Sequence, residues 1–156
     1  MHGEDGKAIC DMRHQGIEAA FPGLNATNYD ITSPPTFDYN CIAWAAEDDA
    51  KWWQPDPFNL YFWPGNSPRE NTLPAYLHAF AAMGYVQCNN SDLEDGFEKV
   101  VIYTGRDGLP THMARQLESG DWTSKLGPSF DISHTSVNDL QGVQYGTVAS
   151  ILRRPK

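Results

Sequence analysis

Apolar residues recur at helical spacing in three stretches of the first half of the chain. The stretch "GIEAAFPGL" predicts a short helix that ends at its Pro-Gly pair. In "NCIAWAAEDDAKWW", Ile42, Ala45 and Ala46 share one helical face, and Asn40 is available as the N-cap residue. The stretch "NTLPAYLHAFAAMGY" predicts a third helix, with a proline near its start and a terminating glycine.

Strand-like segments replace the helical spacing in the second half. "FEKVVIYTG" and "LPTHMARQL" flank residues 106–108 like the two arms of a β-hairpin, and "DWTSKLG" and "YGTVASIL" can supply further strands. We therefore expect an α+β fold in which the helices come first and pack on an antiparallel sheet. That sheet should contain Val100–Tyr103, Thr111–Leu117 and Trp122–Leu126. The stretch "NATNYDITSPPT" is expected to be extended loop, and "KWWQPDPFNLYFWPG" a packed loop.

Composition indicates one globular domain with an acidic surface. The 156 residues are 40% hydrophobic and 12% aromatic, enough for a single core over 1–156, with a less regular N-terminal segment over 1–36. The net charge of −9, from 11 basic against 20 acidic residues, argues against a nucleic-acid or membrane partner. No Sec-type signal or membrane-spanning run is present, so we expect a cytoplasmic protein, or one exported without a Sec signal.

Three cysteines without CxxC spacing fit a reducing compartment and do not form a structural zinc site. Cys10 and Cys88 are expected to be structural residues, because free cysteine is usually buried. Cys41 differs, because it would be the first residue of the second helix, where the helix dipole favours a thiolate. A histidine on the following sheet could stabilise that thiolate, and His112 in "THMARQ" and His134 in "DISH" are the candidates.

Four motifs occur in a fixed order: "YNCIAWAA", "THMARQLESGDWTSKLG", "DISH" and "YGTV". In that order they resemble an uncharacterised bacterial family with a papain-like cysteine-peptidase (CHAP-type) core, over roughly residues 38–155. In that superfamily a cysteine opens the core helix, a histidine stands on the first long strand, and a polar residue on the next strand orients the imidazole. The resemblance therefore implies a papain-like fold, with Cys41 as the nucleophile and His112 as the base.

The third member of the site is left open by the sequence. If the two strands after residue 110 pair as antiparallel neighbours, one register puts Ser124 on the face of His112, and a slip of one residue puts Lys125 there instead. Asp121, nearer the turn, and His134, outside the hairpin, are further alternatives. Lys125 is otherwise most simply interpreted as a charge on a solvated strand face.

The chemistry implied by the pair is nucleophilic attack on an amide carbonyl. A thiolate on Cys41 would attack, and a protonated His112 would give its proton to the leaving amine. The backbone amide of Cys41 and the side chain of Asn40 could donate to the oxyanion. We therefore expect a cysteine-dependent peptidase or amidase that acts through an acyl-enzyme on a peptide or another amide-containing substrate.

Two alternatives use the same residues differently. An acyl transferase or deamidase would share the acyl-enzyme, whereas a non-catalytic binding module would keep only the papain-like scaffold. In that module the aromatic loop from Trp52 to Trp63 would be the recognition surface, although Trp44, Trp52, Trp53 and Trp63 are expected mainly to pack the core. No phosphate-binding loop, HExxH motif or cluster of metal ligands is present, so the sequence implies no metal and no cofactor.

Overall fold

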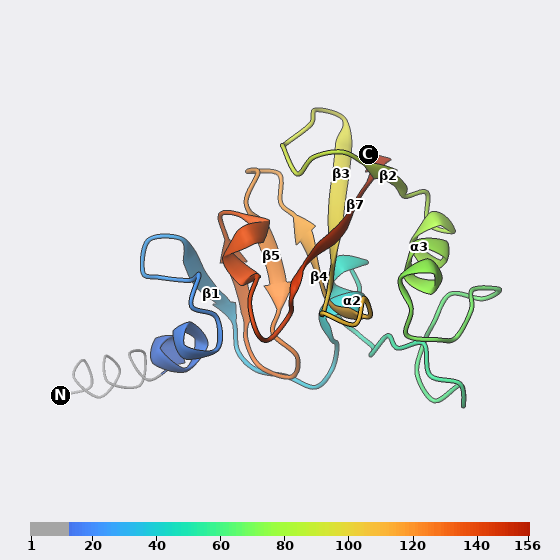
Figure 1. Cartoon of the computed structure of the whole chain (residues 1–156), viewed down its shortest axis with the longest axis horizontal. Coiled ribbons are helices and arrows are strands. Elements are labelled where there is room, and N and C mark those ends of the chain that lie inside the picture. The colour runs from blue at the N-terminus through green and yellow to red at the C-terminus, as the bar shows by residue number, and fades with distance from the viewer. Residues whose placement is uncertain (1–12) are drawn as a thin grey trace.

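Seven antiparallel strands form one sheet in the computed structural model, which describes residues 13–156 (Figure 1). Their order across the sheet is β1-β6-β5-β4-β3-β7-β2, so β3 to β6 pair in chain order as consecutive hairpins, and β1, β7 and β2 join the sheet through longer connections. The strands are β1 Tyr29–Ser33, β2 Val86–Cys88, β3 Phe97–Thr104, β4 Pro110–Gln116, β5 Trp122–Lys125, β6 Asp131–His134 and β7 Thr147–Pro155. The expected α+β arrangement, with helices and an antiparallel sheet, is confirmed.

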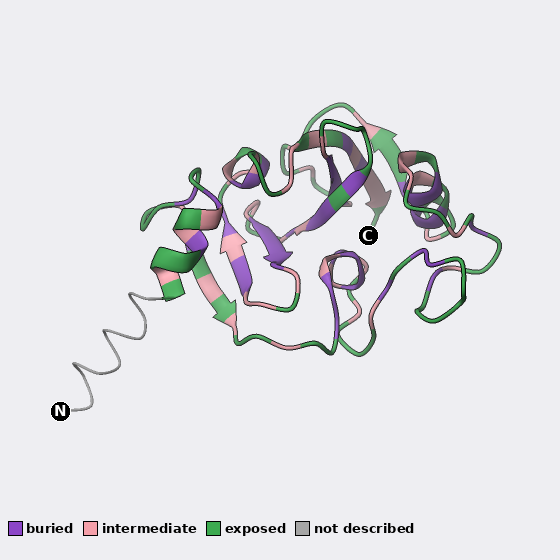
Figure 2. Cartoon of the chain, turned by 60° about the horizontal axis from the view of Figure 1, so that its bottom comes forward, coloured by how far each residue is buried: buried purple, intermediate pink, exposed green. Residues whose placement is uncertain are grey.

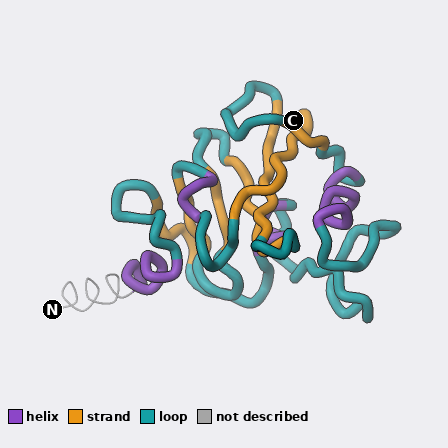
Figure 3. Tube along the Cα trace, in the orientation of Figure 1, coloured by secondary structure: helices purple, strands orange, loops and turns teal. Residues whose placement is uncertain are grey.

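The helices are short, and long loops join them to the sheet (Figure 3). Residues 13–20 are helical, and α2 Cys41–Ala45, α3 Leu73–Ala81 and the 3₁₀ helix η1 Val137–Leu140 follow. Helix α2 has only five residues, because the chain turns into the left-handed region at Glu47, with φ of 65°. Between residues 13 and 156, no helix is long and apolar enough to cross a membrane.

The segment before α2 is more regular than the sequence suggested. Strand β1 lies within the stretch expected to be loop, and it pairs with β6 at the edge of the sheet, with Tyr29 opposite His134. Helices therefore do not all precede the sheet, and the described part of the 1–36 segment contributes a helix and a strand. Tyr29 and Ile31 face the core and alternate with exposed Asp30 and Thr32, but this edge strand is too short for the alternation to stand out in sequence.

The sheet is buried on both faces, and a separate hydrophobic core lies on each. The first core packs α2 and α3 on the sheet and includes Ile42, Ala45, Phe80, Ile102 and Met113. The second core lies on the other face and includes Ile17, Tyr103, Ala114, Trp122 and Leu140. The predicted packing of the α2 face on the sheet is confirmed, because Ile42 and Ala45 are buried there and Ala46 packs against them.

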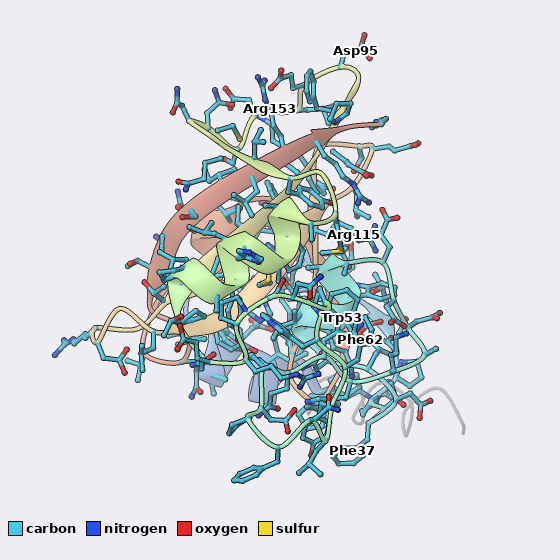
Figure 4. The ribbon with its side chains drawn as sticks, turned by 90° about the vertical axis from the view of Figure 1, so that its right-hand side faces the viewer. Phe37, Trp53, Phe62, Asp95, Arg115 and Arg153 are labelled. Atoms are coloured by element: carbon cyan, nitrogen blue, oxygen red, sulfur yellow. The ribbon has the colours of Figure 1, made fainter. Side chains whose placement is uncertain are left out.

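The aromatic segment between α2 and α3 forms a loop, as expected, with part of it packed. Trp53 and Trp63 are buried in the first core, Trp44 is partly buried against it, and Trp52 is half-buried. Figure 4 shows Trp53 and Phe62 close together, with ring centroids 4.6 Å apart. A parallel bridge joins the same two residues and closes the loop.

Lys125 is fully buried, so its interpretation as a solvated surface charge is wrong. Its ammonium group donates to the carbonyl oxygen of Ser129 and lies 5.2 Å from the centre of the Tyr39 ring. Burial lowers the pKa of Lys125, while the negative charge of Asp131, its cross-strand partner, opposes that shift. Strand β5 is internal and covered on both faces, which local sequence does not reveal.

The Asn40 side chain should stabilise the fold more than an ordinary helix cap. It accepts the Ala43 amide proton and also exchanges two hydrogen bonds with the backbone of Trp53. We expect Asn40→Ala to lower the free energy of unfolding by about 2–3 kcal/mol. Thr72→Ala, which removes the single capping bond of α3, should cost about 1 kcal/mol in the same urea titration. Equal losses for the two variants would contradict the role of Asn40 in holding the loop.

Candidate active site

Cys41 is the first residue of α2, and its N-cap Asn40 fixes where the helix begins. The Asn40 side chain caps Ala43 and, through its amide, holds the backbone of Trp53, with a distance of 2.6 Å from Nδ2 to the Trp53 oxygen. The structure therefore uses this side chain to join the helix start to the aromatic loop. Its proposed donation to an oxyanion stays a prediction.

The Cys41 thiol lies among backbone amides but is largely removed from water. The amides of Met113, Ile42 and Cys41 itself lower its pKa, and burial outweighs them and raises the pKa to about 11. The residue packs partly buried against the first core. At neutral pH the resting group is therefore a thiol, not the thiolate that the helix start alone suggested.

His112 lies on β4 with its ring on the side of the second core. Its imidazole stacks flat on Tyr145, with ring centroids 4.0 Å apart and planes 3° apart, and Tyr103 lies 5.3 Å away. Its Nε2 atom is 3.1 Å from the hydroxyl oxygen of Ser124. The histidine is 1% exposed, so both ring nitrogens depend on the protein for partners.

A line of hydrogen bonds continues from Ser124 to the backbone. The Ser124 hydroxyl is 2.8 Å from Nε2 of His134, and Nδ1 of His134 is 2.9 Å from the carbonyl oxygen of Ser136. A carbonyl oxygen only accepts, so Nδ1 of a neutral His134 carries its proton and Nε2 must accept from Ser124. The Ser124 oxygen then accepts from Nε2–H of His112. We refer to these four groups as the relay.

The relay leaves the Nδ1 atom of His112 as a lone-pair acceptor. This atom is buried and has no hydrogen-bond partner among the described residues. A buried, unsatisfied polar atom is rare in folded proteins and costs stability. The arrangement therefore holds a base in one tautomer, with its free lone pair available to a proton donor.

The pairing of β4 with β5 selects Ser124 from the alternatives left by the sequence. Arg115 pairs with Thr123, and this register puts Ser124 on the face of His112. Lys125 is on the opposite face, over Tyr39. Asp121 lies at the turn, where its backbone oxygen accepts from the Leu117 amide 2.7 Å away. His134, also considered from sequence, is the second partner of Ser124.

Cys41 and His112 form no hydrogen bond with each other in the described structure, and only the backbone of β4 links them. The Met113 amide, one residue from His112, lies against the thiol. The charge of Cys41 also raises the pKa of Tyr145, the residue stacked on His112, although burial is the larger cause. Cys41 packs against the first core, whereas His112 packs on Tyr145 and Tyr103 of the second core, on the other face of the sheet.

The electrostatics oppose a resting thiolate–imidazolium pair. Burial, and secondly the nearby His134, lowers the pKa of His112 well below its ordinary range, so its ring is neutral at neutral pH. With the pKa of Cys41 raised, both partners are uncharged. The expected ion pair is therefore corrected to a neutral thiol and a neutral imidazole, because burial disfavours both charges.

A groove of about 680 Å³ gives access to Cys41. It is lined by the start of α2 at residues 40–42, loop residues 54–57 and 69–71, Tyr76 of α3, and Thr111 of β4. Within residues 13–156, no cluster of three or more His, Cys, Asp or Glu side chains could hold a metal ion. Such an open groove is the usual form of a ligand site.

The role of Tyr145 was not predicted from the sequence, although the motif "YGTV" contains this residue. The neighbouring Gly146 has a φ of 77°, and a Cβ atom there would lie 2.0 Å from the Thr104 carbonyl oxygen. Only glycine permits this close approach, which sets Tyr145 against His112. A tyrosine directly before a glycine at a strand start was the available signal.

The two remaining cysteines have no part in this arrangement. Cys88 is half-buried on β2, and its sulfur lies 3.7 Å from the Asn90 carbonyl oxygen. Its expected role as a buried structural residue is therefore only partly met. Cys10 lies outside the described residues.

Comparison with known proteins identifies one family. Residues 30–153 match the model described as "Domain of unknown function (DUF7689)", a range that contains Cys41 and all members of the relay. No curated protein and no solved structure matches the chain.

The neutral state of Cys41 can be tested by alkylation. With a pKa of about 11, its thiolate fraction and its rate with iodoacetamide should rise about tenfold per pH unit from pH 7 to pH 10. Peptide mapping would measure Cys41 and Cys88 separately. His112→Ala should leave the Cys41 profile unchanged, because a neutral imidazole supplies no charge. A rate already maximal near pH 5, and lowered by His112→Ala, would instead show an ion pair.

Acid should destabilise the fold through the two buried histidines. The pKa values of His112 and His134 are both lowered, mainly by burial, so the unfolded chain binds more protons below pH about 6.5 and folding is favoured above it. The free energy of unfolding should fall by up to about 1.4 kcal/mol per pH unit for each histidine as the pH drops below 6.5. Urea titrations of His134→Gln and His112→Gln/His134→Gln should show successively smaller slopes. An unchanged slope in the double variant would contradict this account.

Proposed function

The chain belongs to the DUF7689 family, and from its geometry we propose that it is a cysteine-dependent hydrolase of amide bonds that forms an acyl-enzyme on Cys41. The unpartnered Nδ1 acceptor of His112, held in one tautomer by the relay and one residue from the Met113 amide that contacts the thiol, is the observation that carries the proposal. A buried base of fixed tautomer without a partner has little structural purpose. It is suited to receive a proton from a neighbouring nucleophile.

In this mechanism the pair starts neutral and separates charge only during attack. The Cys41 sulfur attacks the amide carbonyl carbon as its proton passes to Nδ1 of His112, and the carbonyl π electrons move to oxygen. The backbone amide of Cys41, at the helix start, can donate to that oxyanion. Collapse expels the amine, which takes the proton from His112. Water then attacks the thioester and gives a proton to His112, the bond between carbon and the Cys41 sulfur breaks, and the sulfur takes that proton back as the carboxylic acid leaves.

The groups behind His112 act as positioning residues. When Nδ1 takes the proton, Nε2–H still donates to Ser124, so the relay stays intact through the imidazolium state. Ser124 and His134 are therefore expected to keep the ring oriented and in the productive tautomer. Hydrogen bonds of catalytic pairs often form fully only when substrate is present, so the proposed transfer requires Cys41 and His112 to come together on binding.

We also propose that the scaffold is papain-like. Support comes from helix α2, which begins at Cys41 and packs on β5 and on β4, the strand that carries His112. The side chain on the following strand that meets the histidine is Ser124, where the superfamily has a polar orienting residue. A hydrolase on this scaffold would attack a peptide or another amide; a transferase or deamidase would differ in the acceptor or in the amide that is attacked.

A non-catalytic binding module is the second candidate, and one observation favours it. Burial leaves both Cys41 and His112 uncharged, which lowers the intrinsic reactivity of the thiol. In such a module the groove would bind a ligand without cleaving it. Acylation of Cys41 separates the two functions, because only an enzyme transfers the acyl group.

Acetyl transfer from p-nitrophenyl acetate tests the hydrolase without requiring its natural substrate. With a chelator present, the protein should release p-nitrophenol with turnover, and mass spectrometry should find the acetyl group on Cys41. His112→Ala should slow turnover by about 10²–10⁴-fold, because the proton acceptor is lost. Ser124→Ala should slow it by a smaller factor.

Cys41→Ala should remove turnover, and Cys88→Ala, which alters a thiol on β2, is the matched control that should retain it. Turnover that survives Cys41→Ala, or that ignores the loss of His112, would contradict the proposal. An unmodified Cys41 in a folded protein would favour the binding module.

A further inference from the structure

The loop beside the Cys41 groove exposes an unusual amount of apolar surface. Phe58 is 79% and Leu60 73% exposed, and Tyr61 and Phe62 are also exposed. Figure 2 shows the outer bend of this loop as exposed, with buried stretches where it meets the body of the protein. Contiguous apolar side chains on a surface are a feature of interaction sites. We refer to residues 57–62 as the apolar loop.

The apolar loop is held in shape by hydrogen bonds. The Asp56 carboxylate accepts from the amides of Leu60 and Tyr61, at 2.7 and 3.0 Å. The Arg69 guanidinium pairs with Asp56 at 3.2 Å and donates to the Tyr61 carbonyl oxygen. These bonds hold the loop backbone, although Phe58 and Leu60 are largely exposed. A preorganised surface of this kind binds with a smaller loss of conformational entropy.

The loop and the groove are continuous. Residues 54–57, which lead into the apolar loop, line the groove that reaches Cys41, and Arg69 and Glu70 line it beside them. A ligand that lies on the apolar loop can therefore extend into the groove. An extended chain fits this path better than a globular surface, because it can cover the exposed side chains of the loop and also enter the groove.

Charge indicates which chain would fit. Of the three charged residues that line the groove, Asp56 and Arg69 neutralise each other. Glu70 forms no ion pair with any of the described residues, and its nearest polar partner is the Thr72 hydroxyl at 3.3 Å. Lys51, which lies over the Phe62 ring, is paired with Asp48. The groove therefore carries one unpaired negative charge, on a chain of net charge −9.

We propose that the apolar loop and the groove bind an extended peptide segment with large apolar side chains and at least one Lys or Arg. The apolar residues of the segment would cover Phe58 and Leu60, and its basic residue would pair with Glu70. Only the statement that this segment is a substrate rests on the proposed function. Binding itself does not require the thiol to react.

Binding is measured with Cys41→Ala protein, so that no cleavage can occur. Three short fluorescein-labelled synthetic peptides serve as probes: one that alternates Leu and Phe with Lys, one with Glu in place of Lys, and one with Ser in place of Leu and Phe. Fluorescence anisotropy should show binding of the first peptide, and affinities at least about tenfold lower for the other two.

Variants then locate the site. Phe58→Ser/Leu60→Ser should weaken the first peptide by about tenfold or more, since both side chains lose their apolar contact area. Glu70→Gln should remove most of the preference for Lys over Glu. Val143→Ser is the matched control, because Val143 is an apolar residue that is 100% exposed and lies outside the loop and groove; it should change affinity by less than about twofold. All these positions are exposed, so thermal unfolding should confirm intact folds.

The outcomes separate this inference from the proposed function. Equal binding by the loop variant and the control, or no binding of the first peptide, would overturn the inference. If wild-type protein binds the Leu/Phe/Lys peptide through the loop but is never acetylated at Cys41, the binding surface stands and the hydrolase fails. If wild-type protein turns over p-nitrophenyl acetate but the loop variant binds like its parent, the hydrolase stands and the inference fails.

Discussion

The carbonyl oxygen of Ser136 sets the direction of every hydrogen bond in the relay. Because it can only accept, it places the proton of His134 on Nδ1, which turns the Ser124 hydroxyl towards His134 and the Nε2 proton of His112 towards Ser124. The consequence appears at the far end, where Nδ1 of His112 is left as a lone pair with no partner. A backbone group 24 residues along the chain thereby determines which nitrogen can act as a base.

Burial decides how such a site could work. It raises the pKa of Cys41 and lowers that of His112, so the resting groups are neutral and the sulfur is protected from reaction with solvent electrophiles. Charge would form only when a carbonyl group in the groove takes up the developing negative charge. The same groove adjoins the apolar loop, so the surface that would select a ligand and the group that would attack it are joined by Asp56 and its hydrogen bonds.

Local signals made the helix start at Cys41, the hairpin of β3 and β4, and the antiparallel sheet predictable from sequence. The choice between Ser124 and Lys125 was not predictable, because it depends on the register of β4 with β5. A slip of one residue moves each side chain to the other face of the sheet. The burial of Lys125 and the partnership of Ser124 with His134 follow from β5 being an internal strand. The neutral state of the Cys41 thiol was also not predictable, since a helix start favours a thiolate. The burial that raises its pKa comes from tertiary packing.

The tautomers of the two relay histidines test the account most directly, and imidazole nitrogen chemical shifts in a long-range ¹H–¹⁵N spectrum report them. At neutral pH the account predicts a neutral His112 with its proton on Nε2 and a neutral His134 with its proton on Nδ1. His134→Gln should leave the His112 chemical shifts unchanged if the Ser124 oxygen still accepts from Nε2–H of His112. Ser124→Ala should change them, because that acceptor is lost. A His112 ring protonated on Nδ1, or an imidazolium at neutral pH, would contradict the claim that the relay leaves Nδ1 of His112 as a free base.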